Sequence, residues 1–189
     1  GTLTCVSGPL TLDLQQLSVA YPGALQQTAP VSYSLKAGDL LWLQGPSGVG
    51  KSTFLSTVAG WLPAVSGRVL LNGTELQLYS ASTQREQISV LSQQVGLFNM
   101  TLAANLRLAK PKASDEELLQ SLAEAQLSDW LATLPLGLET ELGEYGVAVS
   151  GGQARRIALA RMLLQNSSIL LLDEPLVGLD QDTAHQLIQ

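Results

Sequence analysis

The sequence predicts an α/β fold in which helices cover a sheet with buried strands. Two apolar runs, at residues 40–43 and 168–172, have the length and composition of strands buried on both faces. The first run leads through a glycine-rich stretch into residues 53–59, which continue as a helix. The chain has 189 residues, of which 46% are hydrophobic and 14% charged, so it can bury the core of one domain.

Turn-forming residues separate further predicted strands in the first half of the chain. Residues 10–43 are predicted to form strands, with turns at residues 21–23 and 36–39. Residues 68–71 are predicted to form a strand that ends in the tight turn Asn72-Gly73, because Asn-Gly favours the backbone angles of a two-residue hairpin.

A helical region follows. Residues 101–165 are predicted to be largely helical, with sheet-forming segments on either side. The sequence S-D-E-E at residues 114–117 is a capping box, in which a serine and a glutamate three residues later satisfy the first N–H groups of a helix.

Composition excludes several classes of protein. The formal net charge of −6 argues against a nucleic-acid surface. The single cysteine, Cys5, excludes a disulfide framework and fits a reducing compartment. No apolar run approaches the roughly 20 residues of a membrane-spanning helix. We therefore expect the chain as given to be soluble.

The stretch GPSGVGKS at residues 45–52 fits the phosphate-binding pattern G-x-x-x-x-G-K-[ST]. A strand that feeds a glycine-rich turn into a helix aims backbone N–H groups and the positive end of the helix dipole at one point. Lys51 would reach the β- and γ-phosphates, and the Ser52 hydroxyl would bind Mg²⁺. The alternative is a glycine-rich turn with a solvated lysine, which the flanking strand and helix disfavour. The motif predicts binding of a nucleoside triphosphate.

Two acidic residues, Asp173 and Glu174, follow the apolar run 168–172. At the end of a buried strand, Asp173 would hold Mg²⁺ through water, and Glu174 would polarise the water that attacks the γ-phosphate. The alternative is that the two acids cap the next helix.

A second glycine pair, in Ser150-Gly151-Gly152, precedes a segment with helical periodicity. Ser150 is predicted to be the N-cap of this helix, whose first turn would then be a second anion-binding site. Alone, the sequence S-G-G is a common loop. Two phosphate-binding helix starts in one chain are most simply explained if each nucleotide is held between two copies of the domain.

Together these motifs resemble the nucleotide-binding domain of ABC transporters of the exporter type. The Walker A motif is residues 45–52, the signature is residues 149–153, and Walker B with its glutamate is residues 169–174. Leu179-Asp180 resembles the end of the D-loop.

The resemblance implies a role for each motif residue. Tyr21 falls where the family stacks an aromatic ring on adenine, and Gln93 matches the Q-loop glutamine that senses Mg²⁺ and the membrane domain. The catalytic residues would be Lys51, Gln93 and Glu174, and the metal would be held by Ser52, Gln93 and Asp173. The nucleotide would be bound by Tyr21, Gly45, Pro46, Ser47, Gly48, Val49, Gly50, Lys51, Ser52, Thr53, Gln93, Ser150, Gly151, Gly152 and Gln153.

Further stretches resemble the exporter subclass. Residues 140–146 resemble the X-loop that contacts the coupling helices, although an acidic surface loop is the alternative, and residues 97–106 resemble the segment after the Q-loop. Residues 152–156 and 178–180 resemble the bacterial cysteine/glutathione exporters of cytochrome bd assembly.

The resemblance implies a P-loop NTPase core with a mixed sheet, an antiparallel β-subdomain and an inserted α-helical signature subdomain. We expect residues 1–189 to form this single domain, with the ATP-binding core and β-subdomain at about 1–100, the helical subdomain at 101–165 and the Walker B and D-loop part at 166–189. His185 is too close to Glu174 to be the switch histidine. We therefore expect a fragment that ends before that residue and hydrolyses ATP weakly on its own.

The expected function is ATP binding and hydrolysis that drive export through attached membrane domains. The expected partners are ATP or ADP with Mg²⁺, a membrane domain of the same polypeptide and a second nucleotide-binding domain, at the cytoplasmic face of the cell membrane. The alternatives are a soluble, non-transport ABC ATPase, and a P-loop kinase or nucleotide-binding regulator.

Overall fold

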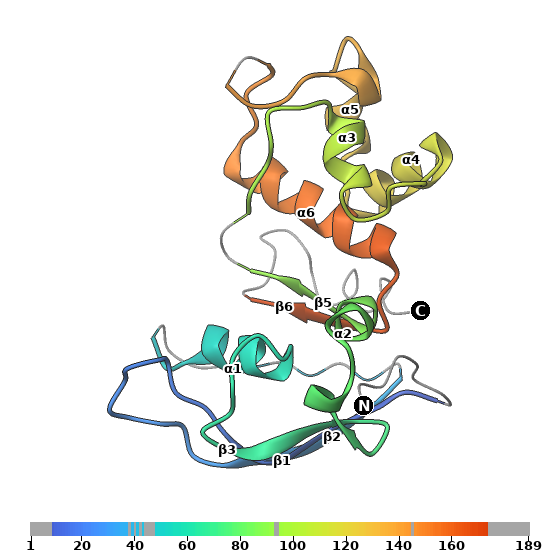
Figure 1. Ribbon diagram of the computed structural model, residues 1–189. Helices are drawn as coiled ribbons and strands as arrows, with labels where there is room; N and C mark the ends of the chain where they lie inside the picture. The colour runs from blue at the N-terminus through green and yellow to red at the C-terminus, as the bar shows by residue number, and fades with distance from the viewer. Residues whose placement is uncertain are drawn as a thin grey trace. The chain divides into compact units, whose positions relative to one another are not determined.

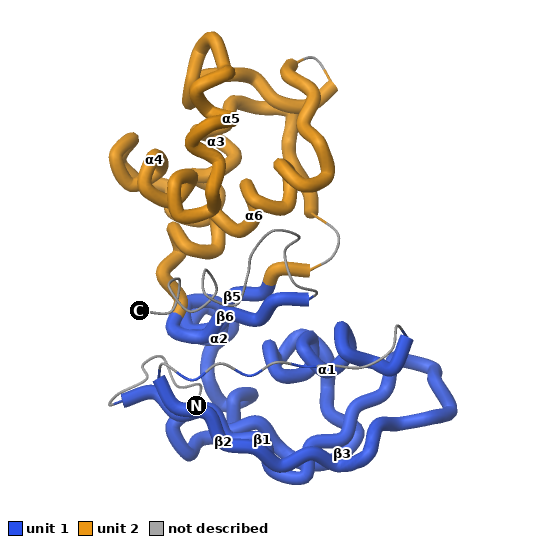
Figure 2. The backbone as a smooth tube through the Cα atoms, turned by 180° about the vertical axis from the view of Figure 1, so that it is seen from behind, with its two compact units in different colours: residues 1–90, 168–173, 188–189 blue, residues 91–167, 174–187 orange. Residues whose placement is uncertain are grey.

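The computed structural model describes residues 9–37, 39, 41, 43, 48–92, 95–144 and 146–173. They fall into two compact units, one within residues 1–90 and 168–173 and the other within residues 91–167 (Figure 2). None of the helices in these described residues is long and apolar enough to cross a membrane.

An antiparallel sheet with the strand order β2-β1-β3-β4 forms one layer of the first unit (Figure 1). The strands are β1 (Thr11–Ser18), β2 (Val31–Lys36), β3 (Ser66–Leu71) and β4 (Thr74–Glu75).

Two local backbone features shape this sheet: a bulge in β1 and the turn between β3 and β4. The register of β1 shifts between Gln15 and Ser18, where Gln16 has a φ of 49°. Gly67 lies against this bulge, and a Cβ there would lie 2.2 Å from the Gln16 carbonyl oxygen, so only glycine fits. The hairpin between β3 and β4 turns at Asn72-Gly73, both at positive φ, as their sequence predicts.

The other elements of the first unit pack on this sheet or follow it. They are α1 (Lys51–Val58), the 3₁₀ turn η1 (Leu76–Leu78), α2 (Ala81–Gln87), β5 (Ile88–Leu91) and β6 (Ile169–Leu172). Phe54 and Val58 of α1 share one core with Leu14 and Leu71 of the sheet, and Leu171 of β6 packs against it. The helix that follows the phosphate motif and the strand that precedes Asp173 are therefore anchored in the same core.

The second unit is helical (Figure 1). It contains α3 (Leu102–Arg107), α4 (Asp115–Glu124), α5 (Ser128–Ala132), η2 (Gly137–Glu139) and α6 (Gly151–Gln165). Helices α3 and α4 both contact α6, where fully buried leucines such as Leu106, Leu122 and Leu159 fill the interior. Ser114 and Glu117 form the predicted capping box at the start of α4.

The predicted α/β fold is confirmed, as are the turns, the helix after the phosphate motif and the helical character of residues 101–165. The strand predicted at residues 40–43 stays a prediction, since residues 40 and 42 lie outside the described part and Leu41 and Leu43 carry no strand assignment. The strand predicted within residues 168–172 is present as β6, and its side chains are half-buried where the sequence predicted a buried strand. Among the described strands it pairs with β5 alone.

Candidate nucleotide-binding site

The described part of the phosphate loop has the backbone that its glycines allow. Gly48 and Gly50 have φ angles of 82° and 99°, which residues with a Cβ rarely adopt. Gly50 is the N-cap of α1 and makes no side-chain cap, and the first turn of α1 contains no acidic residue. The N–H groups and the positive dipole end at Lys51 therefore meet no carboxylate of this helix, which suits an external anion.

Hydrogen bonds between Thr28 and residues 18 and 19 close the loop that carries Tyr21. Thr28 closes it: the Thr28 N–H donates to the Val19 carbonyl at 2.9 Å, and the Val19 N–H donates to Thr28 Oγ1 at 3.1 Å. The Ser18 hydroxyl donates to the Thr28 carbonyl at 2.7 Å. We call these three bonds the Thr28 clasp. A Cβ built at Gly50 would lie 3.7 Å from the Thr28 methyl group, so the clasp lies beside the N-cap of α1. Tyr21, in the loop that the clasp closes, is 70% exposed, so its aromatic face is open to a ligand.

Thr28 is a residue that the sequence analysis missed. Its partners lie 9 and 10 residues away in a segment without regular periodicity, so no local pattern indicates the clasp. A threonine in a loop is too common to be singled out.

Asp173 comes directly after β6 and is only 6% exposed. A buried carboxylate requires compensation by cations or hydrogen-bond donors. Asp173 belongs to the same compact unit as Lys51 and Ser52, so the carboxylate and the phosphate loop are built on one core.

The second candidate anion-binding feature is the start of α6. Ser150 is the N-cap and forms a capping box with Gln153: the Gln153 N–H donates to Ser150 Oγ at 3.2 Å, and the Ser150 N–H donates to Gln153 Oε1 at 2.9 Å. This arrangement leaves the N–H groups of Gly151 and Gly152 outside the box. The predicted N-cap is confirmed, and the Gln153 side chain serves to close the box.

No neighbour in the described part of the chain requires glycine at these two helix positions. Gly151 and Gly152 are exposed, neither has a positive φ, and a Cβ at either would meet nothing within 4 Å. Glycine is a poorer helix former than alanine. A molecule that approaches this backbone from outside the chain would account for the pair.

The described residues that are expected at the nucleotide site divide between the two units, and we call each group a candidate half-site. Tyr21, residues 48–53 and Asp173 belong to the first unit, and residues 150–153 to the second. The remaining residues expected at the site lie outside the described residues: Gly45, Pro46, Ser47, Gln93 and Glu174.

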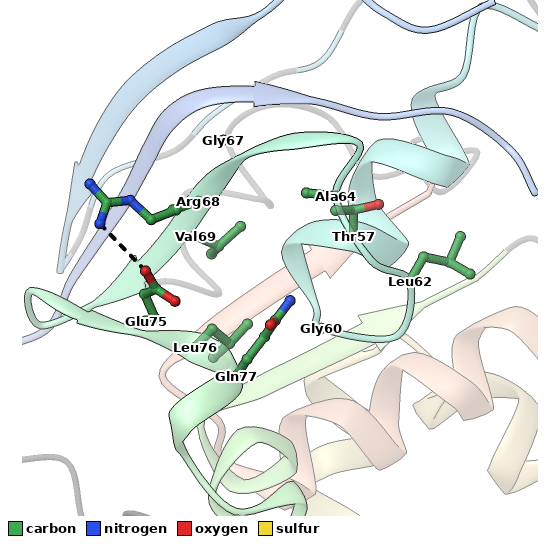
Figure 3. A pocket seen from close by; sticks show the side chains of 10 residues that line it. All are labelled: Thr57, Gly60, Leu62, Ala64, Gly67, Arg68, Val69, Glu75, Leu76 and Gln77. Atoms are coloured by element: carbon green, nitrogen blue, oxygen red, sulfur yellow. Dashed lines mark hydrogen bonds and ion pairs between the residues drawn. The ribbon is translucent and has the colours of Figure 1, made fainter.

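A cavity of about 80 Å³ lies at the far end of α1 from the phosphate loop, between Thr57, Gly60 and the β3–β4 hairpin (Figure 3). The Arg68–Glu75 ion pair, at 3.4 Å, lines one side. Ligand sites usually enclose a few hundred Å³ or more. This cavity is too small for a nucleotide and is not part of either half-site.

Comparisons with known proteins agree with these features. The profile described as "ABC transporter" matches residues 28–177. The chain is 37% identical over 182 residues to "Iron-sulfur clusters transporter ATM1, mitochondrial" of Candida glabrata, covering 96% of this chain and 25% of that protein. It is 39% identical over 190 residues to the "Glutathione/L-cysteine transport system ATP-binding/permease protein CydD" of Bacillus subtilis, covering 97% of this chain and 33% of that protein.

Among solved structures, a bacterial Atm1-family ABC exporter with ATP bound superposes with a TM-score of 0.86 at 30% identity. The match covers 99% of this chain and 33% of that one. The chain therefore spans between a quarter and a third of the length of the relatives described here.

Proposed function

The chain belongs to the ABC transporter family, and we propose that residues 45–52 bind the β- and γ-phosphates of ATP while the start of α6 in a second copy covers the γ-phosphate. The family match and the exporter relatives make the chain an ATPase domain of the exporter type. The residue roles below are part of the proposal.

The donors at the phosphate loop fit Mg²⁺. Ser52 supplies a hydroxyl oxygen at the exposed start of α1, and Asp173 supplies a carboxylate after β6. Mg²⁺ prefers such hard oxygen ligands, to which Gln93 would add an amide oxygen. When bound, Mg²⁺ would neutralise charge on the phosphate oxygens.

Three side chains would bind the phosphates, activate the attacking water and stack on the adenine. Lys51 would place a positive charge on the β- and γ-phosphates. Glu174 would orient the attacking water and accept its developing proton. Tyr21 would stack on the adenine, since the clasp at Thr28 holds its loop beside Gly50.

The exposed glycine pair Gly151-Gly152 is the observation that carries the two-copy proposal. Among the described residues, nothing lies within 4 Å of a Cβ built at either glycine, which leaves room for a phosphate group that approaches this backbone. The Ser150 oxygen accepts from Gln153, yet its own hydrogen remains available for a phosphate oxygen.

The proposed transporter couples this ATP cycle to export through a membrane domain at the cytoplasmic face of the membrane. The resemblance to cysteine/glutathione exporters and the 39% sequence identity to CydD of Bacillus subtilis support a thiol compound as the transported molecule. A soluble ABC ATPase and a P-loop kinase or regulator are not favoured, because the relatives are transporters and a kinase has no use for the start of α6.

A mixing experiment tests whether the site is shared. Lys51→Ala removes one half-site and Gly152→Asp the other, so each full-length variant alone should hydrolyse ATP near background. Co-assembled, they should recover up to about a quarter of parent activity, since half of random dimers are mixed and each mixed dimer has one intact site of two. No recovery in assemblies shown to contain both variants would mean that each chain carries a self-contained site.

A further inference from the structure

Thr28 bonds the start of its own loop through its N–H, its carbonyl and its hydroxyl oxygen. The first two pair with the Val19 carbonyl and the Ser18 hydroxyl, and Oγ1 accepts from the Val19 N–H at 3.1 Å. Ser18 and Val19 are 0% and 1% exposed, so this end of the loop is anchored in the core. A buried N–H that loses its partner is destabilising. The Thr28 hydroxyl is therefore important for closing the loop.

Tyr21 lies between the Thr28 clasp and a tight turn. It follows Val19 by two positions, and its own carbonyl accepts from the Ala24 N–H at 2.9 Å. Gly23 has a φ of 85°, which the third position of a type II turn requires. The backbone is thus fixed on both sides of Tyr21, while its side chain is 70% exposed. A fixed backbone and an open ring suit a residue that stacks on a flat ligand.

The two branches of the Thr28 side chain face different features. The hydroxyl bonds the Val19 N–H, whereas the methyl group faces the N-cap of α1 at Gly50. The distance of 3.7 Å on the methyl side is to a Cβ that Gly50 does not have, so the existing contact is looser. Single van der Waals contacts are weak, and a hydrogen bond to a buried N–H is stronger. Thr28 therefore acts mainly on the Tyr21 loop and only weakly on the phosphate loop.

We propose that Thr28 is a positioning residue for the nucleotide base: its hydroxyl fixes the loop that carries Tyr21, so that the ring is in place before the nucleotide binds. A loop that must be ordered on binding lowers the affinity, and a loop that is already ordered avoids this loss. The inference rests on the proposed function, in which Tyr21 stacks on the adenine. It adds that Thr28 contributes to base binding and not to phosphate binding.

The variants are made in the full-length protein. Thr28→Val removes the hydroxyl and keeps the branched shape, whereas Thr28→Ser keeps the hydroxyl and removes the methyl group that faces Gly50. Ser32→Ala is the matched control, because the Ser32 hydroxyl also accepts from a backbone N–H of β1, that of Gln16, at 2.9 Å. Ser32 lies in β2, outside the loop that the clasp closes.

Isothermal titration calorimetry would compare ATP with inorganic triphosphate, which has no base, while Mg²⁺ is chelated to prevent hydrolysis. Thr28→Val should raise the Kd for ATP about fivefold and change the Kd for triphosphate less than about twofold. Thr28→Ser and Ser32→Ala should leave both values within about twofold of the parent. In a Tyr21→Ala background, Thr28→Val should change the Kd for ATP less than about twofold, since the ring that it positions is gone.

An equal loss of affinity for ATP and triphosphate in Thr28→Val overturns the inference, because Thr28 would then act on the phosphate loop. A loss of equal size with and without Tyr21, or an equal loss in Thr28→Ser, overturns it as well. So does a Tyr21→Ala variant with parent affinity for ATP.

If Thr28→Val fails to fold, Ser18→Ala takes its place. It removes the hydroxyl that donates to the Thr28 carbonyl at 2.7 Å, and the same selective loss of ATP affinity is expected. Equal losses for the two ligands would again overturn the inference. A parent with no measurable affinity for ATP would instead contradict the proposed function, which keeps the two failures distinct.

Discussion

The carboxamide of Asn105 pairs with the backbone of Phe98 as a neighbouring strand would: Oδ1 accepts from the Phe98 N–H and Nδ2 donates to the Phe98 carbonyl, each at 3.0 Å. Nδ2 also donates to the carbonyls of Met100 and Thr101. Asn105 is fully buried in the first turns of α3. One side chain therefore satisfies both backbone groups of Phe98, just before the short antiparallel pairing of Thr101 with Glu141.

Asn105→Ala should lower the free energy of unfolding by about 2–4 kcal/mol, because it removes this network and leaves Phe98 groups without partners. Urea denaturation would measure the change. Gln120→Ala is the control: Gln120 is exposed and its side chain bonds only Glu124 within the described residues, so the effect should stay within about 0.5 kcal/mol. Equal effects of the two substitutions would contradict the role given to Asn105.

Lys51→Ala should reduce ATP affinity at least about tenfold, or about 1.4 kcal/mol, because it removes the cation at the start of α1. Isothermal titration calorimetry would measure the affinity. Lys110→Ala, which removes an exposed lysine paired with Glu117 in the second unit, should leave it unchanged. Parent-like affinity in Lys51→Ala would disprove the phosphate-loop assignment.

Glu174→Gln should keep ATP binding and stop turnover, because an amide cannot accept the proton of the attacking water. ATP-bound dimers should then accumulate and be visible by size-exclusion chromatography. Glu116→Gln, in the exposed first turn of α4, should show parent turnover. If Glu174→Gln turns over normally, Glu174 is only a helix cap.

Glu117 should make stability depend on acid pH. The hydrogen bond from Lys110, followed by the one from the Ser114 N–H, holds the pKa of Glu117 below its ordinary carboxyl value. Its stabilising contribution is therefore complete above the ordinary carboxyl pKa and is lost as the pH falls through that value to the lower pKa of the folded state. Near neutral pH the contribution does not change.

NMR titration of the Glu117 carboxyl should show this lowered pKa directly. In Glu117→Gln, whose amide oxygen can still accept from Ser114, the unfolding midpoint should depend less on pH over the same acid range. An equally steep dependence in both proteins would show that Glu117 does not contribute to it.

The helix caps and the tight turn could be predicted from the sequence, because the residues that form each of them lie within a few positions of one another. Ser114 meets Glu117, and Ser150 meets Gln153, within a single helical turn, and Asn72-Gly73 forms its turn from its own backbone preferences. The glycines at 48 and 50 were predictable for the same reason. These residues fix where α1, α4 and α6 begin.

Only the tertiary structure shows which distant segments contact one another and support these caps and turns. Nothing in the sequence pairs Arg161 with Gly96, because any donor on α6 could reach any carbonyl that packing brought near it. The same holds for Asn99 and Glu144, 45 residues apart, and for the degree to which β6 is covered. Local motifs depend on bonds between neighbours in the chain, whereas the support of the half-sites depends on packing that only the folded chain specifies.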